Sequence, residues 1–340
     1  MPLIDQEKLP WDQENWHSQV DAWLKQVLKK HRLNMIAPPV EVHHQPWSVV
    51  YRIKTETQDL YFKALCPALR HESRLTCKIS EWQPDLIHPV IETDDSRGWM
   101  LMPDGGQTLR QLLTTDRSLE YWKQILPAYA RFQIEMFAHS SDLVRLGVKD
   151  RRLHILPDAF VGMLSDQQSL LIDQPEGLTA KEYVQLSELE PKFRQLCQQL
   201  SDFGIPESLE HDDFHDGNVF YNPGRFRFFD WAESFLAHPF FSLVVNLRSI
   251  AYRFSLAEDS LDLVTLRNLY LKEWQRYASL GDLQQAFRLA MIIGRFNRAL
   301  TWNMVVSTLP EPYRTKESDA FPGWLKLFLE KIIAYPDFSA

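Results

Sequence analysis

One short segment, residues 210–231, constrains the fold more than any other part of the chain. It reads EHDDFHDGNVFYNPGRFRFFDW, with polar side chains crowded where the chain must turn. Val219 to Tyr221 and Arg225 to Phe229 are rich in β-branched and aromatic residues, and the sequence Asn-Pro-Gly between them is a turn signal. The segment therefore predicts a short β-hairpin. Helical periodicity on both sides places this hairpin inside a mainly helical region.

The first hundred residues predict a small mixed lobe. Residues 11–31 carry Trp16, Val20, Trp23, Leu24 and Val27 on one helical face, which predicts an opening amphipathic helix. Further along this lobe the pattern predicts a β-hairpin from strands 48–54 and 60–65, a helix over 68–82, strands over 87–92 and 98–102, and a turn at 103–106.

After residue 106 the pattern becomes mostly helical. Helices are predicted over residues 121–137, 180–202, 260–279, 282–306 and 324–334. We therefore predict an α+β fold in two lobes: a small β-sheet lobe over residues 1–104 and a larger, mainly helical lobe over 105–340. Such an architecture has a natural ligand-binding cleft at the hinge.

Composition excludes several classes of protein. The 340 residues are 45% hydrophobic and 24% charged, with a net charge of −8 and no basic block, so a nucleic-acid partner has no support. Three cysteines without a CxxC pair argue against a disulfide framework or a zinc site. The first residues lack the pattern of a signal peptide, and no run is long enough to cross a bilayer. We expect a cytoplasmic protein with no membrane partner. The oligomeric state is left open.

The polar residues of the 210–231 segment suit phosphoryl transfer. This reaction needs a carboxylate to accept the hydroxyl proton, and oxygen ligands for the Mg²⁺ that bridges the nucleotide phosphates. Asp213, Asn218 and Asp230 offer these groups. In kinases the catalytic Asp precedes an Asn ligand by five positions and an Asp ligand follows a hairpin, and the spacings here are five and twelve.

The two motifs HDDFHDGN and FDW resemble those of the aminoglycoside phosphotransferase and choline kinase family, which has a protein-kinase-like fold. That family usually reads HGDLHPGN and then IDW or IDF. The resemblance implies ATP or GTP as phosphoryl donor and Mg²⁺ as cofactor. It also implies that Asp213 is the catalytic base, that His211 and His215 shape its loop, and that Asn218 and Asp230 are the metal ligands.

The same resemblance predicts nucleotide contacts in the small lobe. A strand lysine should bind the phosphates and pair with a helix glutamate, and Lys63 and Glu72 are the candidates, with Glu72 favoured over Glu81. Backbone groups near Leu101 and Met102 match the family's adenine-binding hinge. The nucleotide-covering loop should lie near residues 45–49, where Ser48 is a candidate phosphate contact although no glycine is present.

Three positions depart from the family pattern. Ser242 stands where the family commonly has an Asp that braces the catalytic loop, so a weaker hydrogen bond replaces a charge-assisted one. Asp212 and Asp216 replace the usual glycine and proline. The change at Ser242 motivates one alternative: a catalytically silent protein that binds a nucleotide or a partner. A protein kinase is disfavoured because no activation segment follows Asp230.

The acceptor is open among an aminoglycoside, a choline-like amine, a sugar, an amino alcohol and a fructosamine. Five carboxylates around the catalytic segment favour a cationic acceptor or, more simply, form a solvated acidic surface: Asp202, Glu207, Glu210, Asp212 and Glu233. Four aromatic residues are candidates for a pocket or a quaternary-amine cage, although helical spacing favours the core: Trp231, Phe235, Phe296 and Trp302. A transition-metal site at 211–216 is a minor alternative.

Overall fold

The computed structural model describes residues 8–314 and 319–335, and the chain divides into two compact units. The first unit comprises Met1–Gln107, Asn222–Ala232 and Met304–Glu317. The second comprises Thr108–Tyr221, Glu233–Asn303 and Ser318–Ala340. The first boundary lies three residues beyond the predicted one at 104/105. Two later segments join the first unit, which sequence periodicity alone does not indicate.

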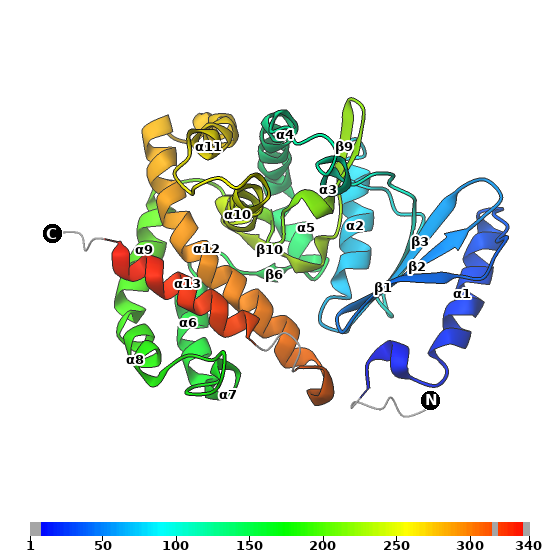
Figure 1. The fold of residues 1–340 in the computed structure, drawn as a ribbon, viewed down its shortest axis with the longest axis horizontal. Coiled ribbons are helices and arrows are strands. Elements are labelled where there is room, and N and C mark those ends of the chain that lie inside the picture. The colour runs from blue at the N-terminus through cyan, green and yellow to red at the C-terminus, as the bar shows by residue number, and fades with distance from the viewer. Residues whose placement is uncertain (1–7, 315–318, 336–340) are drawn as a thin grey trace. The chain divides into compact units, whose positions relative to one another are not determined.

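A five-stranded antiparallel sheet forms the frame of the first unit, with strand order β1-β2-β3-β5-β4 (Figure 1). A helix, α2, connects its third and fourth strands in sequence. The bounds are β1 Val40–Gln45, β2 Ser48–Lys54, β3 Asp59–Leu65, α2 His71–Trp82, β4 Glu92–Asp94 and β5 Trp99–Pro103. The predicted hairpin of residues 48–54 and 60–65 is the central β2–β3 pair.

The predicted strand over residues 87–92 is wrong for most of its length, because only Glu92 lies in β4. Ile87 forms instead an isolated parallel bridge to Phe228. The His88 N–H donates to the Phe228 carbonyl at 3.0 Å, and the Phe228 N–H donates to the Leu86 carbonyl at 2.7 Å. Leu86, Ile87 and His88 therefore pair with the chain segment 222–232 rather than with the sheet, and they attach that segment to the rest of the first unit.

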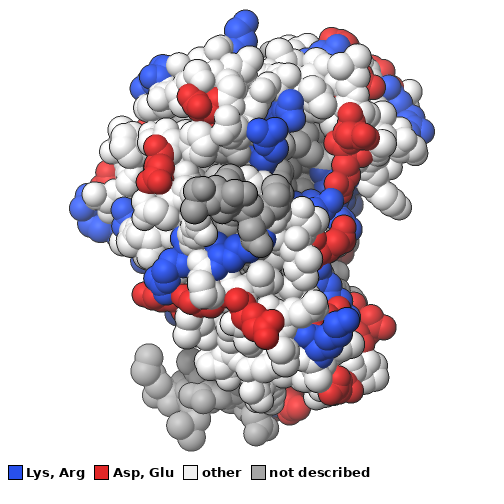
Figure 2. All heavy atoms as spheres, turned by 90° about the vertical axis from the view of Figure 1, so that its left-hand side faces the viewer, with Lys and Arg blue, Asp and Glu red and all other residues white. Residues whose placement is uncertain are grey.

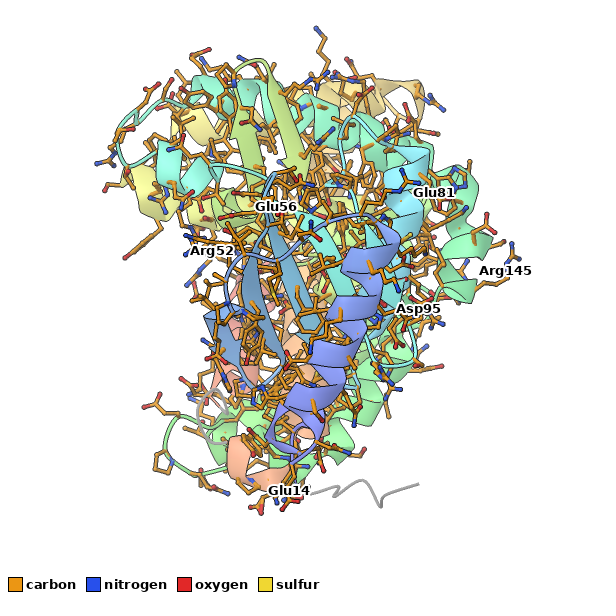
Figure 3. All side chains as sticks on the ribbon, turned by 90° about the vertical axis from the view of Figure 1, so that its right-hand side faces the viewer. Glu14, Arg52, Glu56, Glu81, Asp95 and Arg145 are labelled. Carbon is orange, nitrogen blue, oxygen red and sulfur yellow. The ribbon has the colours of Figure 1, made fainter. Side chains whose placement is uncertain are left out.

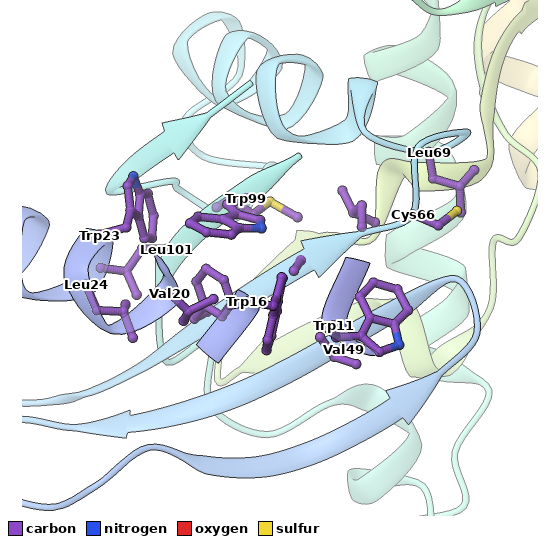
Figure 4. Packing of buried hydrophobic residues seen from close by; sticks show 14 of the residues in the cluster. Trp11, Trp16, Val20, Trp23, Leu24, Val49, Cys66, Leu69, Trp99 and Leu101 are labelled. Atoms are coloured by element: carbon purple, nitrogen blue, oxygen red, sulfur yellow. The ribbon is translucent and has the colours of Figure 1, made fainter. Parts of the chain in front are cut away.

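Helix α1, Trp16–Lys30, covers the sheet as its apolar stripe predicts (Figure 3). Its Trp16 and Trp23 rings contact Phe62 of β3 and Trp99 of β5, with ring centroids 5.6–6.4 Å apart. Figure 4 shows this aromatic packing beside Trp11 and Val49. Aromatic pairs in such tilted and edge-to-face arrangements stabilise a core beyond the area they bury, so α1 is fixed on the sheet that carries the predicted nucleotide residues.

The second unit is mainly helical (Figure 1). The helices assigned to it, with the end of α12 passing into the first unit, are α3 Leu109–Leu112, α4 Glu120–Met136, α5 Ser140–Arg145, α6 Leu156–Ser165, α7 Gln167–Leu170, α8 Ala180–Glu188, α9 Glu190–Asp202, α10 Ser242–Phe254, α11 Leu261–Glu273, α12 Leu280–Thr308 and α13 Ala320–Ala334. The single helix predicted over 180–202 is wrong. Pro191, which suits only a first helical turn, begins a new helix after Leu189.

Three short strands lie among these helices: β6 Lys149–Asp150, β7 Ser208–His211 and β10 Ser234–Ala237. The central β10 pairs in parallel with β6 and antiparallel with β7. The predicted hairpin is present as β8 Val219–Asn222 and β9 Arg225–Phe228. The catalytic segment thus leaves β7, turns, and continues into the hairpin.

Four phenylalanines, one from each of α6, α9, α12 and α13, pack together in the core between these helices. Phe160, Phe193, Phe296 and Phe328 lie with ring centroids 4.8–6.0 Å apart, and all four are fully buried. The predicted α+β class, a small sheet unit with a larger helical one, is confirmed. Within the described ranges, no helix combines the length and apolarity that a membrane crossing requires.

Candidate catalytic site

A buried lysine joins two carboxylates in the first unit. The Lys63 Nζ of β3 donates to Glu72 Oε1 of α2 at 3.0 Å and to Asp230 Oδ1 at 2.6 Å. Lys63 is 7% exposed and Glu72 is 1% exposed. Burial alone would lower the pKa of Lys63, but the two carboxylates raise it above its usual value, so the ammonium stays charged. Residues 167 positions apart in the sequence therefore form one ion-pair cluster.

The backbone at Asp230 has the left-handed conformation, with φ of 66°. A residue with a Cβ pays a strain cost there, of the order of 1 kcal/mol. Next to it, the Trp231 N–H donates to Glu72 Oε1 at 3.1 Å, which holds this turn against α2. The Asp230 side chain keeps 42% of its surface exposed. The strained turn thus presents one carboxylate both to Lys63 and to solvent.

The other predicted nucleotide residues lie on the same sheet. Ser48 begins β2 and is 4% exposed, after a two-residue turn of Pro46 and Trp47. The Leu101 carbonyl of β5 accepts a hydrogen bond from the Ile91 N–H at 2.8 Å, so its hydrogen bonding within the unit is already engaged. Met102, next along β5, is partly exposed. The roles of Ser48, Leu101 and Met102 stay predictions.

The catalytic segment of the second unit is a tight loop that His215 organises. The His215 Nδ1 atom accepts from the Gly217 N–H at 3.0 Å, and its Nε2 faces Asp213 Oδ2 at 3.3 Å. The tautomer that satisfies both contacts carries its proton on Nε2. At Gly217 a Cβ atom would lie 2.7 Å from His215 Cε1 and 2.8 Å from Arg110 Cζ, so any other residue there would force these side chains to shift.

Asp213 and Asn218 contact each other across this loop. The Asn218 Nδ2 donates to the Asp213 carbonyl at 3.0 Å and to its Oδ2 at 3.3 Å. His211 lies fully buried at the start of the loop, and its Nδ1 accepts from the Asp213 N–H at 3.3 Å. The structure therefore brings together the four predicted loop residues His211, Asp213, His215 and Asn218.

An arginine of α12, which the sequence did not single out, holds the acidic side of the loop. Arg298 is 5% exposed and donates to Asp213 Oδ1 at 3.0 Å, to Asp212 Oδ2 at 3.2 Å, and to Glu233. Burial alone would raise the pKa of Asp213, but Arg298, with His215 and His211, lowers it well below its usual range. Asp213 is therefore ionised at neutral pH.

The carboxylates around the loop are not a solvated acidic surface, so that explanation is wrong for the central ones. Glu210 and Asp212 are 0% and 2% exposed. The Asn297 Nδ2 donates to both, at 3.0 and 2.9 Å, and the Thr301 Oγ1 donates to Asp212 at 2.6 Å. Burial raises the pKa of Glu233 to about 7 despite its contact with Arg298. Of the five carboxylates, only Asp202 is largely exposed.

Ser242 braces the loop through a group of buried polar atoms. The His211 N–H donates to Ser242 Oγ at 3.1 Å and to Tyr129 OH at 3.0 Å. Ser242 Oγ in turn donates to Glu210 Oε2 at 3.0 Å. Burial and the neighbouring Asp212 raise the pKa of Glu210 well above its usual value. A carboxyl group is thus present at the brace, but it comes from β7 and not from position 242.

Asp216, the other departure from the family pattern, is also buried and paired. Its carboxylate is 2% exposed and accepts from Arg110 Nε at 2.9 Å, while Arg253 of α10 contacts its second oxygen. Arg110 Nη2 also lies 3.2 Å from His215 Nδ1. Two arginines therefore anchor the turn that a proline would otherwise stiffen.

The candidate aromatic cage is mostly core. Trp231, Phe235 and Phe296 are fully buried, and Trp302 is half-buried with the Arg298 guanidinium 5.4 Å from its ring centroid. Within residues 8–314 and 319–335, no group of three or more His, Cys, Asp and Glu side chains is arranged to hold a metal ion. The donor set at 211–216 therefore gives no transition-metal site in the described chain.

No protein-family model matches the chain, and no curated protein sequence matches it. Solved structures do match. An ethanolamine kinase from Plasmodium vivax aligns with a TM-score of 0.62 at 11% identity, over 94% of this chain and 89% of that one. A choline/ethanolamine kinase family protein from Mesorhizobium loti aligns with a TM-score of 0.60 at 12% identity, over 93% and 95%.

A third solved structure, an amicoumacin kinase in complex with AMP-PNP and Ca²⁺, aligns with a TM-score of 0.55 at 13% identity, over 93% of this chain and 96% of that one. At such identities the likeness concerns the fold. The chain therefore has the protein-kinase-like fold of the choline/ethanolamine kinases and aminoglycoside phosphotransferases, as the resemblance of its motifs predicts.

Proposed function

We propose that this protein is a small-molecule kinase that transfers the γ-phosphoryl group of ATP or GTP to a hydroxyl group. The observation that carries the proposal is the cluster of Lys63, Glu72 and Asp230. Kinase chemistry needs a lysine fixed by a helix glutamate and a metal-binding aspartate after a hairpin. A buried ammonium held by two carboxylates, one of them partly exposed on a strained turn, supplies these parts.

In this proposal Lys63 contacts the nucleotide phosphates and Glu72 fixes its position. The backbone near Leu101 and Met102 meets the base, and because the Leu101 carbonyl is occupied by Ile91, Met102 is the better placed of the two. Ser48 is the candidate phosphate contact at the start of β2. The neighbouring fold of the amicoumacin kinase, solved with AMP-PNP, supports nucleotide binding.

The donor set suits Mg²⁺, which prefers carboxylate and amide oxygens. The Asn218 amide nitrogen is turned toward Asp213, which leaves its amide oxygen as the atom for a cation, and the Asp230 carboxylate keeps exposed surface. Asn218 and Asp230 would hold the ion. Bound Mg²⁺ would neutralise charge on the transferring phosphoryl group.

Asp213 has the role of catalytic base. Its low pKa makes it a weak base for most of the reaction, so its main work is to accept a hydrogen bond from the acceptor hydroxyl and aim that oxygen at the phosphorus. The proton passes to Asp213 as the new P–O bond forms and the bond from the γ-phosphorus to the β–γ bridging oxygen breaks, which releases the nucleoside diphosphate. His215, Asn218 and Arg298 keep the carboxylate in place during this step.

An ATP-consumption screen with Mg²⁺ over hydroxylated amines, sugars and antibiotics tests the proposal and identifies the acceptor. We expect a hit among aminoglycosides, choline-like amines, sugars or amino alcohols. Because Glu210, Asp212 and Glu233 are already engaged by other side chains, they give no particular support to a cationic acceptor. Mg²⁺-dependent nucleotide binding without turnover on any acceptor would favour the catalytically silent alternative.

Variants then test the residue roles. We expect Asp213→Asn to lower kcat roughly 10²–10⁴-fold, as for loss of a general base, while nucleotide affinity is retained. Asp230→Asn should weaken Mg²⁺ binding, so that a higher Mg²⁺ concentration is needed for half-maximal activity, and should lower turnover. Asp202→Asn, the same change at an exposed carboxylate, is the control and should leave turnover unchanged. Near-normal turnover by Asp213→Asn would show that Asp213 is not the base.

A further inference from the structure

The second unit contains a cavity of about 370 Å³ among α10, α11, α12 and α13. Its volume lies in the range of small-molecule binding sites. None of the predicted catalytic, nucleotide or metal residues lines it. The cavity therefore offers a binding site separate from the phosphotransfer residues.

Basic side chains dominate the charge of this cavity. Five basic residues and one acidic residue line it: Arg248, Arg267, Arg288, Arg295, Lys331 and Glu258. This concentration of positive charge is unusual in a chain with a net charge of −8. Figure 2 looks at the side of the molecule where α13 lies and shows Lys and Arg side chains near the middle of that face.

Most of this charge has no acidic partner. Glu258 pairs with Lys331 at 3.1 Å. Over the described chain, none of the four arginines forms an ion pair with a carboxylate. Arg267 donates instead to the Asn268 side-chain oxygen at 3.0 Å, and Arg295 donates to the Met291 carbonyl.

Two of the arginines are half-buried. Burial, followed by repulsion from Arg288, lowers the pKa of Arg267. Burial also lowers the pKa of Arg295, although Glu258 and Glu330 oppose the effect and repulsion from Arg248 adds only a smaller part. Partly buried guanidinium groups that form no direct ion pair are costly. An anion bound between them would remove that cost.

The walls between the basic groups are apolar. Leu247, Phe287, Met291 and Ile292 contribute hydrocarbon or aromatic surface, and the Arg267 guanidinium lies 5.4 Å from the centroid of the Phe287 ring. A ligand that fits both surfaces has an anionic head and an apolar body. We infer that this cavity binds a small amphipathic anion, a carboxylate or phosphate group on a hydrocarbon or aromatic body. The inference does not depend on the proposed kinase activity.

Titration calorimetry on the full chain at low salt tests the head-group requirement. The probes are decanoate, decyl phosphate, decanol and decyltrimethylammonium, all below their micelle concentrations. We expect the two anions to bind at one site, at least about tenfold more tightly than the neutral and cationic analogues, and to lose affinity as salt rises. Equal binding of all four probes would overturn the inference, as would binding to phosphatidylglycerol vesicles without binding of the free anions.

Paired variants locate the site. Arg267→Gln with Arg295→Gln should weaken decanoate binding about tenfold or more, while Arg145→Gln, an exposed arginine of α5, should not. If the double variant does not fold, Arg288→Gln with Arg248→Gln removes two exposed charges at the same cavity and should reduce the salt dependence of binding. Unchanged affinity and unchanged salt dependence in these variants would show that the anion binds elsewhere.

Discussion

At the residue scale, Arg298 determines the state of the proposed catalytic base. One guanidinium contacts three carboxylates, those of Asp212, Asp213 and Glu233, and only 5% of its surface is exposed. Arginine suits this position because its planar group offers several donors in fixed directions and stays charged. Its removal would leave buried carboxylates without a counter-charge.

We therefore predict that Arg298→Met lowers the free energy of unfolding by about 3–5 kcal/mol at neutral pH, the usual cost of breaking a buried ion pair. Without Arg298, burial would raise the pKa of Asp213, so the carboxylate of the variant would take up a proton as pH falls, which relieves the cost of burying its charge. The deficit of the variant should thus be largest at pH 7.5 and smaller at pH 4.5. Urea unfolding at both pH values measures it.

Arg298→Lys is the matched variant, because it keeps the positive charge but loses the planar guanidinium group with its several N–H donors. Its free energy of unfolding should lie between those of the wild type and Arg298→Met. Arg194→Met, at an exposed arginine paired with Glu190, is the control and should show little change. If Arg298→Met loses the same unfolding free energy relative to wild type at both pH values, the electrostatic explanation is contradicted.

Whether the role of a residue can be predicted from the sequence depends on how far it lies from its partners along the chain. Asp213, Asn218 and Asp230 lie within one short motif, so their chemistry is readable from fixed offsets. Arg298 lies 85 positions after Asp213, on a helix whose pattern looks like ordinary packing. Such a partner becomes visible only when the fold is known, because ion pairing across distant segments leaves no local periodicity.

At the element scale, β7 and the start of α10 share the bracing of the catalytic loop. Glu210 supplies the carboxyl and Ser242 the hydroxyl that joins it to the His211 N–H. Neither Glu210 nor Ser242 has any exposed surface. The family pattern predicts an Asp brace at position 242 and none at position 210, so the sequence pattern alone does not reveal that Glu210 of β7 supplies the carboxyl group. Helix α10 itself was not predicted.

This arrangement predicts that Ser242→Asp, which introduces the residue common in the family, lowers the free energy of unfolding. A second carboxyl beside Glu210 would add like charge and volume to a closed site. We expect Ser242→Asp to be less stable than Ser242→Ala, which itself should cost about 1–3 kcal/mol by leaving buried polar groups unpaired. Urea unfolding ranks the variants.

The double variant Glu210→Gln with Ser242→Asp is the decisive comparison. It moves the carboxyl from β7 to α10 and should recover part of the stability that Ser242→Asp loses, with any phosphotransfer activity recovering in parallel. If the double variant is as unstable as the sum of its single changes, the two positions do not share one role.

At the scale of the whole molecule, both units contain a deeply buried histidine that burial holds neutral. His88 of the first unit is 3% exposed, with Nε2 at 2.9 Å from the Pro103 carbonyl, and burial lowers its pKa to about 4. His238 of the second unit is fully buried, its Nδ1 accepts from the Phe240 N–H at 3.3 Å, and burial lowers its pKa to about 3.

Both histidines make the folded chain sensitive to acid. Their folded pKa lies below the value of an unfolded histidine, near 6.5, so the unfolded state binds more protons below that pH. Each group therefore costs stability as pH falls, by about 2 kcal/mol between pH 7 and pH 5. Glu210 and Glu233 act in the opposite direction because their pKa values are raised. Only a comparison of variants separates the two effects.

We predict that His238→Asn, which keeps an acceptor for the Phe240 N–H but cannot titrate, narrows the difference in unfolding free energy between pH 7 and pH 5 by about 2 kcal/mol. His88→Gln, which keeps a donor for the Pro103 carbonyl, should narrow it similarly in the first unit. His17→Gln is the control, because the His17 side chain is exposed on α1. Urea unfolding of all four proteins at both pH values provides the measurement. An unchanged difference in His238→Asn would mean that this buried imidazole is already protonated at pH 5, against the pKa that its burial implies.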